Sequence, residues 1–396
     1  MFSLRLSALA VRPWRTPEPR LLHKGFPLAL FTDIEPEPEP RRRIRRIGWS
    51  ILSVAVVGSV AVALIPAPYV IEQPGPVFNV LGDVTVGGKQ VPLIDIPTEK
   101  TYVTNGTLDM LTVTIRGNRQ DLPTWLDVAT AYFDPSRAVV PVDEIYPLGV
   151  SLEDSNQQGK VDMQNSQKEA VAAALKKLGY VFPSTLDVVQ TQPGSPAEGV
   201  LLPGDIILTL DGQSFPDVTG LRAAIKVNGV GAPASIALMR DGVERTIRVT
   251  PILSQGDTPV PILGIIVGSD YKFPVDVTIQ LENVGGPSAG MMFALGIIDK
   301  LSPGKLNGGA KVAGTGTIDS TGVVGPIGGI RQKLYGARNA GAEWFLAPTA
   351  NCNEVTGHIP AGLTVFAIAT LDDALAALKA IESGGDTSSL PACPTN

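Results

Sequence analysis

The chain has 396 residues and a net charge of −6, and this length accommodates two or three domains. Residues 1–46 carry ten Lys/Arg against five Asp/Glu, which leaves a net charge of −11 on residues 47–396. An acidic body argues against nucleic acid as a partner. The two cysteines and two histidines form no cluster with zinc-ligand spacing, so we expect no metal site and no cofactor.

A long apolar segment near the start of the chain is its clearest physical signal. Residues 47–71 contain no charged side chain, and about 20 apolar helical residues span the hydrocarbon core of a membrane. Pro66 and Pro68 place the end of the helix near Ile65, so we assign a transmembrane helix to residues 47–66. Five arginines within 41–46 precede this segment. They predict a single-pass protein of the cell membrane with a cytoplasmic N-terminus and an extracytoplasmic body.

The alternative interpretation of this segment is a cleaved signal peptide. The basic stretch of a signal peptide would lie near the chain start, whereas about forty residues precede these arginines, so we favour an uncleaved anchor. Residues 1–46 contain the stretch EPEPEPRRR. We interpret them as a basic, solvated cytoplasmic tail without a fold of its own.

Two elements are expected between residues 70 and 179. Apolar and polar residues alternate over Thr101–Ile115, which is the period of a half-buried strand. The stretch from Ser166 to Gly179 predicts an amphipathic helix. Ser166 would be its N-cap, with Glu169 three residues later, and Gly179 would end it.

Residues 180–252 contain turn signals between short apolar runs, namely GSPAEG, LLPGD, DGQ and RDGVE. Asp-Gly pairs tolerate the positive φ of tight hairpin turns. With the sequence SPA…LLPGDIILTLDGQ, this segment resembles a PDZ domain of bacterial membrane and periplasmic proteases. PDZ domains take up an extended peptide as an added strand and often hold its C-terminal carboxylate. The resemblance therefore implies peptide capture, and a small β-rich spacer is the alternative.

The stretch GGPSAG delivers Ser288 to the start of an apolar helix. A serine at such a place is often only a helix cap. The alternative is a nucleophile, because Gly285, Gly286 and Gly290 have no side chains and would let a substrate backbone approach. The unpaired N–H groups of the first helical turn could also stabilise an oxyanion.

A nucleophilic serine needs a base, and the chain offers few. His23 is expected in the cytoplasm, and His358 has no motif around it, so a Ser–His–Asp triad is disfavoured. A lysine can serve if burial lowers its pKa, whereas an arginine stays protonated. Lys333 lies on a predicted helix after the stretch GVVGPIGG, beside Ile330 and Leu334 of its apolar face. The alternative interpretation of Lys333 is a solvated helix lysine.

GGPSAG followed by GPIGGIRQK resembles the Lon-type Ser–Lys protease domain. The resemblance implies that Ser288 is the nucleophile and Lys333 its general base. In the same way Thr315, in the stretch AGTGTI, would hydrogen-bond the lysine. Gly286, Pro287 and Ala289 would be supporting residues of the site. The acidic residue that the family usually has before GPSAG is replaced here by Gly285.

The order of the segments resembles bacterial membrane-anchored PDZ/Lon-like proteases over residues 44–380. The implied fold is α+β, with the PDZ domain (180–252) inserted between an N-terminal part (70–179) and the main part (253–383) of the protease domain. Since the chain contains no Walker A pattern, we expect no nucleotide as a partner.

The resemblance implies an ATP-independent serine endopeptidase. Its partners would be the lipid bilayer and extracytoplasmic protein or peptide substrates. The sequence does not decide between a monomer and a homo-oligomer. The alternative function is a catalytically inactive, membrane-tethered PDZ module that only binds peptides. A channel or transporter is disfavoured by the single span.

Cys352 and Cys393 are the only cysteines. Both fall on the predicted extracytoplasmic side, where disulfides persist, so we predict that they are paired. The bond would tie down the polar C-terminal tail, residues 384–396. Two free thiols are the alternative.

Overall fold

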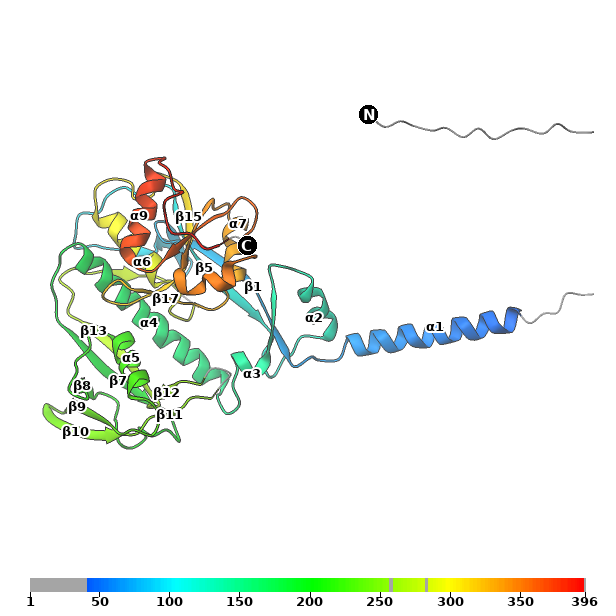
Figure 1. The fold of residues 1–396 in the computed structure, drawn as a ribbon, viewed down its shortest axis with the longest axis horizontal. Coiled ribbons are helices and arrows are strands. Elements are labelled where there is room, and N and C mark those ends of the chain that lie inside the picture. Colours follow the sequence, from blue (N-terminus) through cyan, green and yellow to red (C-terminus); the bar gives the residue numbers. More distant parts are fainter. Residues whose placement is uncertain (1–40, 256–258, 282–283, 395–396) are drawn as a thin grey trace, which may run out of the picture. The chain divides into compact units, whose positions relative to one another are not determined.

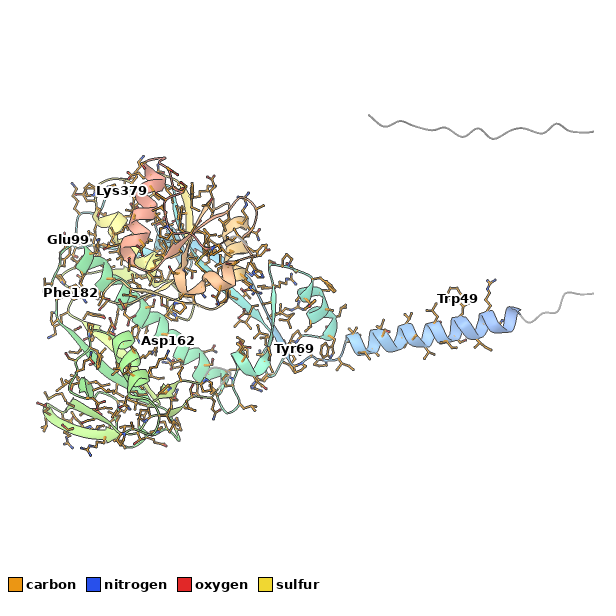
Figure 2. All side chains as sticks on the ribbon, in the orientation of Figure 1. Trp49, Tyr69, Glu99, Asp162, Phe182 and Lys379 are labelled. Atoms are coloured by element: carbon orange, nitrogen blue, oxygen red, sulfur yellow. A yellow bond between two sulfur atoms is a disulfide. The ribbon has the colours of Figure 1, made fainter. Side chains whose placement is uncertain are left out.

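The computed structural model describes residues 41–255, 259–281 and 284–394 (Figure 1). The chain divides into two compact units, residues 1–58 and 59–396, and each is described by itself. Most of the predicted cytoplasmic tail lies outside the described residues. Its last six residues begin helix α1 (Arg41–Ala63). The Arg45–Ala63 part of α1 is long and apolar enough to cross a membrane, judged by length and composition. Its exposed side chains, Trp49 among them, are drawn in Figure 2.

A six-stranded sheet organises the larger part of residues 59–396. Its strand order is β19-β18-β15-β5-β1-β6. The pairs from β19 to β5 are parallel, whereas β1 pairs antiparallel with both β5 and β6. These strands are β1 (Tyr69–Asn79), β5 (Thr107–Arg116), β6 (Ala138–Pro141), β15 (Lys311–Gly314), β18 (Trp344–Pro348) and β19 (Thr364–Ile368).

Helices cover both faces of this sheet, and the alternation of side chains along its strands explains why. Successive strand residues point to opposite faces. Met110 therefore joins the core under α4, α6 and α9, while its neighbour Leu111 joins the core under α7 and α8. The helices involved are α4 (Leu152–Lys177), α6 (Gly290–Leu301), α7 (Ile330–Asn339), α8 (Cys352–Val355) and α9 (Leu371–Glu382).

A second, five-stranded antiparallel sheet contains most of the segment that resembles a PDZ domain. Its order is β10-β9-β8-β7-β13, and helix α5 contributes to its separate apolar core. The predicted boundary at residue 252 falls before β13, which pairs with β7 and stands at one edge of the sheet. The elements are β7 (Ser184–Thr191), β8 (Ile206–Leu210), α5 (Val218–Asn228), β9 (Ala234–Arg240), β10 (Val243–Val249) and β13 (Ile265–Tyr271).

Short elements complete the described fold, and its mixed α+β class agrees with the prediction. Four two-stranded sheets pair β2 with β3, β4 with β14, β11 with β12, and β16 with β17. The remaining bounds are β2 (Asp83–Val86), β3 (Lys89–Pro92), β4 (Ile94–Asp95), α2 (Trp125–Tyr132), α3 (Val142–Ile145), β11 (Ile252–Leu253), β12 (Pro261–Ile262), β14 (Thr278–Ile279), β16 (Thr317–Ile318), β17 (Val324–Gly325) and the 3₁₀ turn η1 (Thr349–Asn351).

The helix predicted to be capped by Ser166 begins fifteen residues earlier than predicted, so that prediction is wrong. The N-cap of α4 is Ser151, whose hydroxyl accepts a hydrogen bond from the N–H of Asp154. Ser166 lies inside the helix and is buried. The predicted C-terminal end is close to the observed one, since α4 ends at Lys177, just before Gly179.

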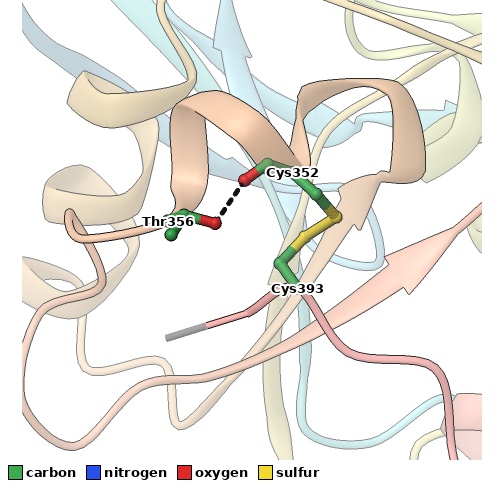
Figure 3. The surroundings of a disulfide bond; sticks show 3 residues. All are labelled: Cys352, Thr356 and Cys393. Carbon is green, nitrogen blue, oxygen red and sulfur yellow. Dashed lines mark hydrogen bonds between the residues drawn. A yellow bond between two sulfur atoms is a disulfide. The ribbon is translucent and has the colours of Figure 1, made fainter. Parts of the chain in front are cut away.

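Cys352 and Cys393 form a disulfide, which confirms the predicted pairing (Figure 3). Cys352 opens α8, where its carbonyl accepts a hydrogen bond from Thr356 Oγ1. The tail that carries Cys393 bridges the β19 edge, because Ala392 pairs with Phe366. Cys393 is buried in the core beneath α7 and α8. The bond closes a sequence separation of 41 residues, which is worth about 4 kcal/mol in the chain-entropy treatment.

Candidate active site

Ser288 does not cap the helix that follows it. Helix α6 starts at Gly290, and its N-cap is Ala289, with no side-chain cap hydrogen bond. Gly286 has a φ of 84°, a left-handed conformation that favours glycine. Through this turn Ser288 comes to lie one residue before the cap. Its carbonyl accepts hydrogen bonds from the N–H of Gly316 and from Thr315 Oγ1.

Lys333 occupies the first turn of α7 and is only 2% exposed. The N-cap of α7 is Gly329, which has a left-handed backbone. A Cβ at Gly329 would lie 2.6 Å from the side chain of Val113 on β5. Glycine at this position therefore lets α7 approach the sheet closely, and the approach buries Lys333 in the domain interior.

The structure brings Ser288, Lys333 and Thr315 together from three separate elements. Lys333 Nζ donates to Ser288 Oγ at 2.7 Å and to Thr315 Oγ1 at 3.0 Å. Thr315 follows the end of β15. Its hydroxyl therefore joins the lysine to the carbonyl of the serine, and it fixes both groups by hydrogen bonds of ordinary length.

Burial lowers the pKa of Lys333 from 10.5 to about 7, and the negative charge of Glu72 on β1 opposes this shift. Burial disfavours the charged ammonium, because the buried group loses the hydration that stabilises its charge in water. Burial also raises the pKa of Glu72. A substantial fraction of Lys333 is therefore neutral near pH 7, and the neutral amine can accept a proton.

The serine opens onto a cleft of about 560 Å³. The N–H groups of Ser288 and Ala289 have no acceptor among the described residues, whereas the N–H of Met291 already donates to the carbonyl of Gly316. The cleft is lined by Pro76, Phe78, Met110, Leu111, Thr112, Val113, Thr114, Met163, Val284, Gly285, Gly286, Pro287, Ser288, Ala289, Gly328 and Lys333. Lys333 is the one charged residue among these described lining residues, which combine apolar side chains with threonine hydroxyls and glycine backbone.

Helix α4 supports the serine loop, a role that the sequence interpretation missed. The N–H of Gly286 donates to the carbonyl of Gly159 at 2.9 Å, and Ser166 Oγ donates to the carbonyl of Pro287 at 2.8 Å. A Cβ at Gly290 would lie 2.8 Å from Ser166 Oγ. Gly290 thus permits helix packing, which corrects the expectation that it admits a substrate backbone. Only Gly285 and Gly286 of the three glycines line the cleft.

The same helix contacts the edge strand of the five-stranded sheet. Asn165 Nδ2 donates to the carbonyl of Val267 at 2.8 Å, and Asn165 Oδ1 accepts from the N–H of Ser269 at 3.3 Å. These backbone groups belong to β13, and they point away from its partner β7. The side-chain amide of Asn165 therefore takes the place of one peptide unit of an added strand.

Further polar contacts join α4 to helix α5. Asp162, labelled in Figure 2, forms an ion pair with Arg222 at 3.2 Å. Glu169 is buried near Asp217, the N-cap of α5. Burial, and then the charge of Asp217, raise the pKa of Glu169 to about 8. Glu169 is therefore mostly protonated near neutral pH, which lets two carboxyl groups lie close together.

His358 takes no part in the site, in agreement with the sequence interpretation. Its Nδ1 lies 3.0 Å from the carbonyl of Thr356, in the loop after α8. Within the described ranges, no three His, Cys, Asp or Glu side chains are grouped so that they could hold a metal ion. The polar contact at the cleft is that of the Ser288 hydroxyl with the buried amine of Lys333.

Comparison with known families supports a protease. Residues 282–380 match the Lon protease (S16) C-terminal proteolytic domain, and residues 147–250 match a PDZ domain. The second match begins before α4 and ends before β13. The two matches therefore assign a PDZ domain and a Lon-type proteolytic domain to successive parts of the chain.

Curated relatives agree with the first match. The chain is 39% identical over 93 residues to a Lon protease of Lachnoclostridium phytofermentans, covering 23% of this chain and 11% of that protein. It is 32% identical over 166 residues to Lon protease 2 of Herpetosiphon aurantiacus, covering 40% of this chain and 20% of that protein. The chain therefore spans only about a tenth to a fifth of the length of these relatives.

A solved structure is similar to part of the chain. The PDZ domain of an SdrC-like protein from Listeria innocua is 24% identical, and the match covers 21% of this chain and 92% of that one with a TM-score of 0.20.

Proposed function

We propose that this chain is a membrane-anchored, ATP-independent serine endopeptidase in which Ser288 is the nucleophile and Lys333 its general base. The observation that carries the proposal is the contact of 2.7 Å between Lys333 Nζ and Ser288 Oγ. The lysine is buried and has a pKa of about 7. An activated nucleophile needs a base within hydrogen-bond reach and in its deprotonated form, and this pair meets both conditions.

The reaction would proceed in two steps, acylation of the serine and hydrolysis of the acyl-enzyme. The neutral amine of Lys333 takes the proton of Ser288 as Oγ attacks the substrate carbonyl, and the resulting ammonium returns that proton to the leaving amine. Water then attacks the acyl-serine with Lys333 again as base, which releases the acid and regenerates the hydroxyl. The N–H groups of Ser288 and Ala289, at the N-terminus of α6, are the candidate oxyanion donors. Thr315 would orient the amine.

The five-stranded sheet would capture substrate chains. An extended peptide would add to the β13 edge, because β13 stands at the edge of the sheet and PDZ domains bind peptides by strand addition. Such a peptide must compete with Asn165 for the backbone groups of Val267 and Ser269. Binding of a peptide at the β13 edge would therefore release α4 from that edge.

The anchor would hold the catalytic body outside the cytoplasm. Two observations support this topology. The apolar part of α1 follows a cluster of arginines, which are retained on the cytoplasmic side. The body also contains a disulfide, which persists in oxidising compartments. The substrates would accordingly be extracytoplasmic proteins or peptides, and flexible or unfolded chains in particular.

Cleavage of an unstructured protein such as β-casein by the full chain in detergent micelles tests the proposal. Ser288→Ala should lower the cleavage rate by on the order of a thousandfold or more. Ser302→Ala, at the C-cap of the same helix, should leave the rate unchanged. Equal cleavage by the parent chain and Ser288→Ala would reject the nucleophile. A parent chain that binds peptides without cleaving any would favour the alternative of an inactive peptide-binding module.

A further inference from the structure

Helix α2 (Trp125–Tyr132) exposes an apolar face. At 100° per residue, Trp125, Leu126, Ala129, Tyr132 and the following Phe133 lie on one side of the helix. Tyr132 is 78% exposed and Phe133 83% exposed. Exposed apolar residues that stand singly are ordinary on a protein surface, whereas contiguous apolar patches mark an interaction site.

The opposite side of α2 is already used for packing. Val128 and Ala131 are buried there. The single charged residue of the helix, Asp127, is held in a capping box with Thr124 and in an ion pair with Arg116 at 2.9 Å. The helix is therefore apolar on both faces, a pattern typical of a helix that is covered on both sides. Its outer face needs a partner that is itself apolar.

Backbone hydrogen bonds tie α2 to the residues that follow α1. The N–H of Trp125 donates to the carbonyl of Ile65 at 3.1 Å, and the N–H of Ala67 donates to the carbonyl of Pro123 at 2.8 Å. Pro66 also pairs with Thr124. Ile65 is only two residues beyond the end of α1. The first residue of α2 is thus fixed beside the point where the apolar helix ends.

The geometry points to the lipid bilayer as the partner of this face: we propose that α2 lies in the interfacial layer of the outer leaflet, with Trp125, Leu126, Tyr132 and Phe133 in contact with lipid. Tryptophan and tyrosine are the residues enriched at the boundary between hydrocarbon and headgroups. An amphipathic or apolar helix lying in that layer inserts its apolar face by roughly 5–10 Å. The inference rests on the proposed membrane anchor.

The length of the anchor is consistent with this depth. Arg45–Ala63 comprises 19 residues, which extend over about 28 Å at 1.5 Å per residue, close to the thickness of the hydrocarbon core. Leu64 and Ile65, also exposed, would then lie at the outer boundary. Since α2 begins beside Ile65, its apolar face would lie at the level of the headgroups.

Site-directed fluorescence in vesicles tests the proposal. Phe133→Cys and Val181→Cys, each in the full chain with Cys352 and Cys393 paired, are labelled with an environment-sensitive NBD dye. The labelled chains are reconstituted in phosphatidylcholine vesicles, with or without a nitroxide near the headgroup end of the acyl chain. Val181 is the matched control, because it is also apolar and 93% exposed. Unchanged peptide cleavage checks that each variant is folded.

The expected result is that lipid-borne nitroxide lowers the emission at position 133 by about twofold or more, while aqueous iodide has little effect. Position 181 should show the reverse. Equal responses at the two positions in chains that co-float with vesicles would overturn the α2 proposal and leave the anchor standing. Shielding at 133 from both quenchers would mean that a second protein copy covers the face, which also overturns it. Chains that do not co-float with the vesicles would reject the anchor, and α2 with it.

Discussion

Helix α4 contacts two regions of the molecule, the serine loop and strand β13. These regions differ in whether their functional groups are accessible. At the serine loop, Gly159 and Ser166 hold the backbone of Gly286 and Pro287 while Ser288 faces a cleft of about 560 Å³. At β13, the neighbouring residue Asn165 bonds the backbone groups that an added strand would need. The proposed catalytic groups are therefore in contact and open to the cleft, whereas Asn165 occupies the proposed edge for peptide capture.

The difference suggests that chemistry and capture are controlled separately. Successive helical residues point about 100° apart, so Ser166 can hold the catalytic loop while Asn165 covers the edge of β13. A peptide that added to β13 would displace Asn165 and so break the contact between α4 and β13, while the contact of Ser166 with the serine loop would remain.

Lys333→Met should separate activity from stability. Cleavage should fall by on the order of a thousandfold or more, because methionine cannot accept the proton of Ser288. The free energy of unfolding at neutral pH should rise by a few kcal/mol, because a lysine pKa lowered from 10.5 to about 7 costs on the order of 5 kcal/mol. The measurement is urea unfolding alongside β-casein cleavage.

The pH dependence of that stability gain has a definite sign. Between pH 7 and 10.5 the unfolded chain binds the lysine proton and the folded chain does not, so the parent becomes more stable as the pH rises. The gain from Lys333→Met should therefore shrink toward pH 10.5. The exposed Lys311 provides the control substitution, Lys311→Met. A gain that does not vary with pH would contradict the lowered pKa.

Thr315→Val removes the hydroxyl that accepts from Lys333 Nζ and donates to the carbonyl of Ser288. We expect kcat to fall roughly 10- to 100-fold with little change in KM, the effect of losing one hydrogen bond to an amine that acts in the reaction. Thr317→Val, two residues along, is the matched control. A rise in KM with little change in kcat would show that the threonine shapes substrate binding instead.

The sequence could predict which residues gather at the candidate site but not the helix that supports them. Ser288, Thr315 and Lys333 lie in short glycine-rich motifs, and the resemblance of these motifs to the Lon-type protease domain selected them. The first half of α4 is polar, contains Gly159 and shows no apolar stripe, so periodicity starts the helix too late. The contacts of Asn165 and Ser166 link residues more than 100 positions apart, and no local pattern encodes them.

The edge strand illustrates the same limit. Residues 265–271 follow the predicted end of the PDZ domain at residue 252. The sequence prediction therefore places them in the protease domain. Their pairing with β7 joins them to the five-stranded sheet instead. Which sheet a strand joins depends on which strand edge is available for pairing in the folded chain. The sequence of the strand alone does not specify that partner.

Asn165→Ala should expose the backbone groups of Val267 and Ser269 at the β13 edge. The N–H of Ser269 loses its acceptor on α4, so its hydrogen exchange should accelerate by about tenfold or more. Cleavage of β-casein should rise a few-fold while cleavage of a short peptide stays the same. Asn228→Ala, which removes side-chain bonds at the end of α5, should leave exchange at Ser269 unchanged. Slow exchange at Ser269 in Asn165→Ala would mean that α4 does not cover this edge.

The most direct test of the central claim is the rate at which a fluorophosphonate probe labels Ser288 in the full chain, followed by intact mass from about pH 5 to about pH 9. The rate should rise about tenfold per pH unit and level off above a midpoint of about 7, the pKa of the buried Lys333. Lys333→Arg should remain unlabelled over the whole range, because arginine keeps its proton. A labelling rate that does not depend on pH, or equal labelling of Lys333→Arg and the parent, would contradict the assignment of Lys333 as the base of Ser288.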